Sequence, residues 1–109
     1  MSGAARIAGL RAQLGGPRDG ALLRFSLGSA LLAEGDPGAA AEMLRAAVDF
    51  DPAYSAAWKL LGRALADARD RDGAAAAWER GIETAHARGD VQAAKEMQVF
   101  LRRLRAAGP

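Results

Sequence analysis

The sequence predicts an all-α fold, and three observations lead to this prediction. Alanine accounts for 28 of the 109 residues, and alanine favours helices over strands more than other residues do. Apolar side chains recur every three or four residues along most of the chain, which is the spacing of one helix face. The pattern also repeats after 34 residues, a length that accommodates two short helices and their turns.

The chain begins with a predicted leading helix inside residues 1–17. Leu10 and Leu14 lie four residues apart, on one face of a helix over residues 4–14. The run Gly15-Gly16-Pro17 ends this helix, because glycine and proline together favour a turn.

A first helix pair is predicted over residues 21–54. Asp19 is the expected N-cap of its first helix, and Gly35 ends that helix, since glycine adopts positive φ at no steric cost. Asp36 is expected to cap the second helix, with Pro37 in the first turn, where the missing N–H is no loss. The predicted inward faces comprise Leu23, Leu27, Leu31, Ala40, Leu44, Ala47 and Val48.

A second pair is predicted over residues 55–88. Asp51 is the expected N-cap of its first helix, because a proline follows it as one follows Asp36. Asp70 or Asp72 is expected to cap the second helix. The inward-facing residues are then Trp58, Leu61, Leu65, Ala74, Trp78 and Ile82.

A last helix is predicted over residues 90–106. Gly89 ends the preceding helix and Asp90 caps this one. Its polar outer residues and the end of the chain soon after it favour a capping helix over the start of another pair. The apolar stripe of this helix comprises Val91, Ala94, Met97, Leu101 and Leu104.

The two pairs correspond residue by residue. A shift of 34 positions aligns Gly28 with Gly62 and Ala40 with Ala74. Helices that cross closely need small residues at the crossing point, and each pair supplies a glycine and an alanine there. The 34-residue shift therefore aligns positions at which close helix packing requires small residues.

On these residues the sequence resembles the tetratricopeptide repeat. Eight positions characterise that 34-residue repeat, and seven of the eight fit in each unit, counted from Ala21 and from Ser55. Arg24 departs from the pattern where the first repeat begins, at the start expected to be exposed. His86 stands where a helix-ending proline belongs. The fitting residues are Leu27, Gly28, Leu31, Ala40, Leu44, Ala47 and Pro52, then Trp58, Leu61, Gly62, Leu65, Ala74, Trp78 and Gly81.

The resemblance implies a right-handed α-solenoid of about six helices in a single domain over residues 1–109. Two full repeats at 21–54 and 55–88 would lie between the leading helix and the capping helix. With the segment GDVQAAKEMQVFLRRL after its two repeats, the chain resembles a group of small bacterial tetratricopeptide proteins of about this length. That group supplies an architecture but no activity.

Little in the sequence suggests catalysis, a metal or a cofactor. Cysteine is absent and His86 is the only histidine, so thiolate chemistry and a histidine-rich metal site are excluded. The acidic pairs Asp49/Asp51 and Asp70/Asp72 flank helix starts, where capping accounts for them. The glycine-rich segment 15–20 lacks the Gly-Lys-Ser/Thr ending of a phosphate loop. We therefore predict a protein that is not an enzyme and holds no cofactor.

The resemblance implies instead that the first helix of each pair lines a concave groove for a peptide or helix of a partner protein. The groove would have an apolar part and a basic part, so we expect an adaptor whose partner presents an apolar anchor beside acidic residues. Lysine and asparagine that some relatives use to clamp a terminal carboxylate are replaced by Phe25 and Ser29. The groove residues implied are Leu22, Phe25, Ser29, Leu32 and Ala33, with Ala56, Lys59, Arg63, Ala66 and Asp67.

Charge suggests two alternatives. The chain has 15 basic and 13 acidic residues, a near balance that argues against nucleic acid as the main partner. The basic surplus lies in residues 86–109, at Arg88 and, in the last helix, at Lys95, Arg102, Arg103 and Arg105. This second surface could bind a polyanion, or Phe100 beside it could join two copies into a homodimer or scaffold. With no apolar run long enough to span a membrane, a cytoplasmic protein is expected.

Overall fold

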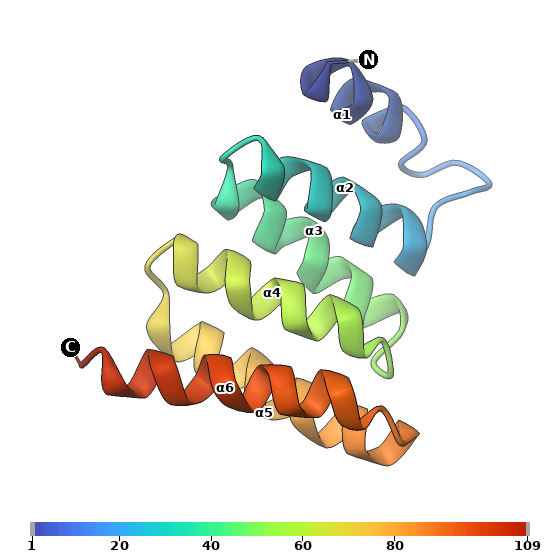
Figure 1. The fold of residues 1–109 in the computed structure, drawn as a ribbon. Coiled ribbons are helices and arrows are strands. Elements are labelled where there is room, and N and C mark those ends of the chain that lie inside the picture. The colour runs from blue at the N-terminus through green and yellow to red at the C-terminus, as the bar shows by residue number, and fades with distance from the viewer. Residues whose placement is uncertain (1, 109) are drawn as a thin grey trace.

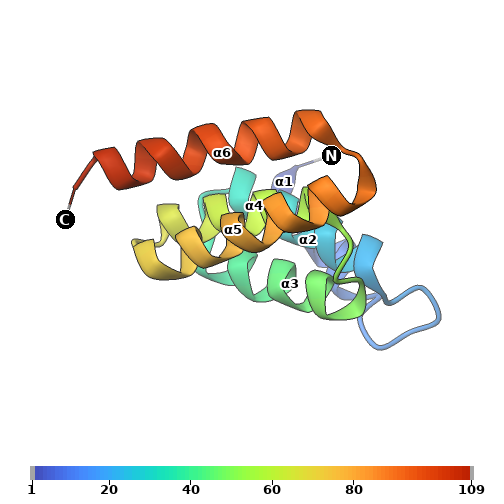
Figure 2. The same ribbon diagram turned by 90° about the horizontal axis from the view of Figure 1, so that it is seen from below.

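The computed structural model describes residues 2–108, and within them all regular structure is helical. Helices α2, α4 and α6 lie side by side on one face of the molecule, and α3 and α5 lie behind them (Figure 1). We call the surface formed by α2, α4 and α6 the A face. Figure 2 shows α6 along one edge of the molecule. The six helices are α1 (Gly3–Arg11), α2 (Ala21–Ala33), α3 (Pro37–Phe50), α4 (Ser55–Asp67), α5 (Arg71–Arg88) and α6 (Val91–Ala106).

Three of the predicted N-caps are confirmed. The carboxylate of Asp36 accepts from the N–H of Ala39 at 3.2 Å, and the carboxylate of Asp90 accepts from that of Ala93 at 3.1 Å. Asp70 caps α5 in the same way at 2.9 Å. Each bond satisfies one of the N–H groups that a helix start leaves without a partner.

Two predicted caps are wrong. Asp19 does not cap α2; its carboxylate instead accepts from the backbone N–H of Gly15 at 2.8 Å and from the guanidinium of Arg24. Asp51 lies at the end of α3, and its carboxylate accepts from the N–H of Ala53 at 3.1 Å in a local turn. The helix after it begins at Ser55, without a side-chain cap.

The close helix crossings fall where the repeat predicts. A Cβ atom on Gly28 would lie 2.6 Å from Leu44 Cγ and 3.3 Å from the carbonyl oxygen of Ala40. A Cβ atom on Gly62 would overlap the indole of Trp78, and one on Gly81 would lie 2.9 Å from Trp58 Cβ. These glycines allow close packing of α2 against α3, of α4 against α5, and of α5 against α6.

The core follows the predicted inward faces with two exceptions. Leu27, Leu44, Leu61 and Met97 are the largest side chains with no exposed surface. The first exception is Val91, which was predicted inward but is 54% exposed at the first position of α6. The other inward residues of that helix, from Ala94 to Leu104, are buried or half-buried.

The second exception is Arg24, expected at an exposed start of the array. Its side chain is only 22% exposed, because it pairs with Asp19 at 2.8 Å beside the loop from α1. His86 lies exposed within α5, which continues to Arg88 where a proline would have ended it. Within residues 2–108, no helix is long and apolar enough to cross a membrane.

Candidate functional site

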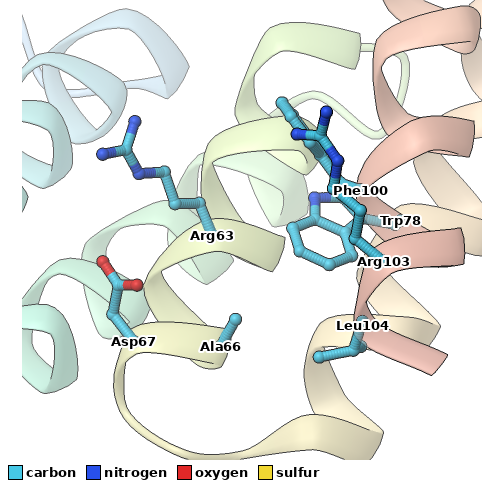
Figure 3. Close-up of a pocket in the computed structure, with 7 residues that line it drawn as sticks. All are labelled: Arg63, Ala66, Asp67, Trp78, Phe100, Arg103 and Leu104. Atoms are coloured by element: carbon cyan, nitrogen blue, oxygen red, sulfur yellow. The ribbon is translucent and has the colours of Figure 1, made fainter. Parts of the chain in front are cut away.

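The A face carries two open hollows, one between each pair of neighbouring helices. The first, which we call the α4–α6 hollow, has a volume of about 370 Å³. Seven residues line it, and Figure 3 shows them: Arg63, Ala66 and Asp67 from α4, Trp78 from α5, and Phe100, Arg103 and Leu104 from α6.

The second, the α2–α4 hollow, has a volume of about 230 Å³. Arg63 borders both hollows, so they lie next to each other across α4. Together they provide a surface along three consecutive helices. The lining residues of this second hollow are Ser29, Leu32, Ala33, Leu60 and Arg63.

The floor of the α4–α6 hollow is aromatic. The ring of Phe100 packs against the indole of Trp78 with centroids 5.5 Å apart and planes inclined by 46°. The Nε1–H of Trp78 donates to the carbonyl oxygen of Lys59 at 3.0 Å. Because this polar atom already has a partner, the indole presents apolar surface to the hollow.

Phe100 corrects one sequence expectation. The helical spacing placed it outside the inward stripe, where it was available to join two copies of the chain. In the structure it is half-buried against the core and packs on Trp78. Trp78 and Leu104, which the helical pattern predicts in the core, also line the hollow.

The expected basic part of the groove is divided. The ammonium group of Lys59 lies 3.5 Å from the carboxylate of Glu96 on α6, so its charge is partly compensated. Arg63 is exposed, and no ion pair joins it to an acidic side chain within residues 2–108. Arg63 is therefore the cation of the predicted pair that remains available to a partner.

The expected apolar part of the groove is also divided. Leu32 lines the α2–α4 hollow, whereas Leu22 is 70% exposed near the start of α2. The ring of Phe25 stacks on that of Tyr54 with centroids 5.0 Å apart. Burial, and then the charge of Asp51, raise the pKa of the Tyr54 hydroxyl, which therefore stays neutral.

The basic residues of the predicted second surface differ in their contacts. The guanidinium of Arg88 donates to the carbonyl oxygen of Ala53 at 2.6 Å, and that of Arg105 lies 3.3 Å from the carboxylate of Glu79. Lys95 and Arg102 are exposed, whereas Arg103 lines the α4–α6 hollow. The structure thus brings Phe100 and Arg103 together with Arg63, although the sequence predicts Arg63 on a different surface.

Comparisons with known proteins agree on the architecture. The sequence pattern described as "Tetratricopeptide repeat" matches residues 31–97. A "TPR repeat-containing protein" of Pseudomonas aeruginosa is 54% identical over 98 residues, which cover 90% of this chain and 93% of that protein.

Two solved structures are also similar to this chain. A Bordetella parapertussis protein known from a solution structure is 47% identical, with a TM-score of 0.80 over 98% of this chain and 90% of that one. The Sgt2 TPR domain of Aspergillus fumigatus is 26% identical, with a TM-score of 0.74 over 98% of this chain and 74% of that one.

Proposed function

This chain belongs to the tetratricopeptide repeat family, which makes it a protein-interaction module, and on that premise we propose that it is a non-catalytic adaptor. It binds a peptide or helical segment of a partner protein along the A face. The observation that carries the proposal is the pair of hollows joined at Arg63. A segment crossing α2, α4 and α6 would contact both.

The chemistry of the A face supports binding rather than catalysis. Within the described part of the chain, no three histidine or acidic side chains are grouped so that they could hold a metal ion. His86 is exposed on α5, which is not one of the helices of the A face. The surface offers apolar hollows and a free guanidinium, which are groups that recognise a protein segment.

The experiment begins with affinity capture from the source organism and then measures the purified partner by calorimetry. Arg63→Glu reverses the charge shared by both hollows, and we expect it to raise the dissociation constant about tenfold. Arg45→Glu is the matched control, because Arg45 is exposed on α3, behind the A face. Equal affinity of the two variants for the partner would contradict the proposal.

A further inference from the structure

We propose that the α4–α6 hollow is an anchor pocket for one large apolar side chain of the partner, flanked by acidic side chains. This inference rests on the proposed function and specifies the chemistry of the segment that is bound. Its occupant is an internal stretch of a partner protein in which a phenylalanine, tryptophan or leucine adjoins aspartate or glutamate.

The floor of the hollow is suited to an apolar side chain. Trp78, Phe100 and Leu104 surround a space that Ala66 leaves open on the α4 side. A larger residue in place of Ala66 would occupy part of that space. An apolar side chain packed on this floor would lose contact with water on the side that faces it, and burial of apolar surface is the main source of affinity in such pockets.

The structure also explains why the aromatic floor reaches the A face. Trp78 belongs to α5, which lies behind that face (Figure 1). Because Gly62 has no side chain, the indole packs directly against α4 and reaches the space between α4 and α6. The floor is therefore held by the core and does not need the ligand to order it.

The cations around the hollow favour acidic side chains in the partner. Several nearby cations are already engaged: Lys59 by Glu96, Arg105 by Glu79, and Arg71 by the carbonyl oxygen of Leu104 at 2.7 Å. These contacts occupy three of the cations near the hollow.

Arg63 and Arg103 line the hollow from α4 and α6, and among residues 2–108 neither forms an ion pair. Figure 3 shows both guanidinium groups in the upper part of the view, with the indole of Trp78 below that of Arg103. Asp67 lies lower in the same view, beside Ala66. The cationic end of the hollow would pair with carboxylates beside the apolar anchor.

The test is a nuclear magnetic resonance titration of the full chain, labelled with ¹⁵N. The probe is the peptide Ser-Glu-Glu-Phe-Glu-Ser, blocked at both ends so that no terminal carboxylate is present. The two indole N–H signals report separately: Trp78 lines the hollow, whereas the indole of Trp58 donates to the carbonyl oxygen of Pro52. We expect the signals of Trp78, Phe100 and Arg103 to shift and that of Trp58 to stay.

Two altered peptides test the two parts of the proposal. Replacing phenylalanine by alanine should weaken binding about tenfold, because the hollow would then stay unfilled. Replacing the glutamates by lysines should weaken it by a similar factor, because lysine is repelled by the two guanidinium groups. Equal binding of all three peptides would overturn the proposal, as would binding only of a peptide with a free terminal carboxylate.

Variants of the protein complete the test. Ala66→Phe fills the hollow from α4 and should raise the dissociation constant of the probe about tenfold. Ala76→Phe is the matched control, since Ala76 is exposed on α5 and does not line the hollow. Arg103→Glu should weaken binding of the glutamate peptide and strengthen binding of the lysine peptide.

The outcome separates this inference from the proposed function. If the probe shifts Ser29 and Leu32 but not Trp78, binding on the A face stands and the anchor pocket is refuted. If the probe shifts no signal, the anchor pocket is refuted, while calorimetry with the captured partner still decides the proposed function.

Discussion

Trp78 occupies the space that a side chain on Gly62 would need. A Cβ atom built on Gly62 overlaps the indole ring, and the Nε1–H of that ring is fixed by the carbonyl oxygen of Lys59 at 3.0 Å. These two residues on adjacent helices therefore set both the approach of α5 to α4 and the floor of the α4–α6 hollow. The first prediction tests this contact.

Gly62→Ala should destabilise the fold. Overpacking costs about 1–3 kcal/mol, and the gain from replacing glycine within a helix offsets about 1 kcal/mol of that. We expect the free energy of unfolding, measured with urea, to fall by up to about 2 kcal/mol. Gly38→Ala in α3 is the control: its Cβ would meet no atom within 4 Å, so it should stabilise by about 0.4–1 kcal/mol. Equal effects of both changes would contradict this account of the crossing.

A second prediction concerns the end of α4. Arg69 is the one non-glycine residue with positive φ within residues 2–108, at 67°, and it occupies the place that Gly35 takes after α2. In both turns the next N–H bonds back to the helix, Asp36 to Leu31 at 3.0 Å and Asp70 to Leu65 at 2.8 Å. A left-handed conformation costs a residue with a Cβ about 1–2 kcal/mol.

Arg69→Gly should therefore stabilise the protein. Glycine loses about 0.5–1 kcal/mol more backbone entropy on folding, which leaves a net gain of about 0.5–1 kcal/mol. Gly35→Ala is the reciprocal change and should destabilise, since Gly35 has a φ of 82°. Thermal unfolding of both variants checks the prediction, and a decrease in stability for Arg69→Gly would refute it.

The repeat could be read from the sequence because its signals are local or strictly periodic. Gly28 and Gly62 recur 34 residues apart, and the N-caps Asp36, Asp70 and Asp90 stand one residue before their helices. Such signals need only the neighbouring residues and the helical period.

The two wrong caps show where local signals fail. Asp51-Pro52 and Asp36-Pro37 are the same dipeptide, but α3 ends at Asp51 and a three-residue turn follows before the next helix. Asp19 has an aspartate's preference for helix starts, yet Arg24 supplies a stronger partner. In each case the sequence identifies a carboxylate that can accept a hydrogen bond, but it does not identify the donor.

The candidate site was predicted in part for the same reason. The resemblance to the repeat family implied that Arg63 lies on the groove side, and the structure puts it between the two hollows. The contacts of Phe100 with Trp78 and of Lys59 with Glu96 join residues that are 22 and 37 positions apart. These contacts depend on how α6 packs against α4 and α5. The apolar spacing within a single helix does not specify that packing.

The third prediction concerns pH. The guanidinium of Arg24, followed by the backbone N–H of Gly15, holds the pKa of Asp19 well below its ordinary value of 3.8. A carboxyl group whose pKa is lower in the folded state stabilises the fold when it is ionised. This contribution is complete above the unfolded pKa, near 4, and is lost as the pH falls from there toward the folded pKa.

Asp19→Asn should therefore lower stability at pH 7 and make stability less dependent on pH below 4. Arg24→Gln should raise the pKa of Asp19 toward its ordinary value, because Arg24 is the largest cause of the shift. Carboxyl chemical shifts followed from pH 7 to pH 2 measure this pKa. If the pKa of Asp19 is the same in the wild type and in Arg24→Gln, the ion pair does not stabilise the loop between α1 and α2.

The last prediction concerns Asp90, which links two helices of the A face. One oxygen of its carboxylate accepts from the N–H of Ala93 at the start of α6, and the other accepts from the hydroxyl of Ser55 at 3.3 Å. Ser55 is the first residue of α4 and is only 5% exposed. The bond therefore joins the beginnings of the helices on either side of the α4–α6 hollow.

Asp90→Ala should lower the free energy of unfolding by more than the loss of an N-cap alone would. A lost N-cap costs about 0.5–2 kcal/mol, and a buried hydroxyl without a partner adds about 1–3 kcal/mol. Asp70→Ala is the matched control, because Asp70 caps α5 at 2.9 Å and, among the described residues, forms no other side-chain hydrogen bond. In a double-mutant cycle, Ser55→Ala should recover much of this second cost in the Asp90→Ala background, because it removes the hydroxyl that has lost its partner. Additive effects in urea unfolding would show that the hydroxyl and the carboxylate do not interact; coupling would mean that this bond helps to set the spacing of α4 and α6 on which the proposed anchor pocket depends.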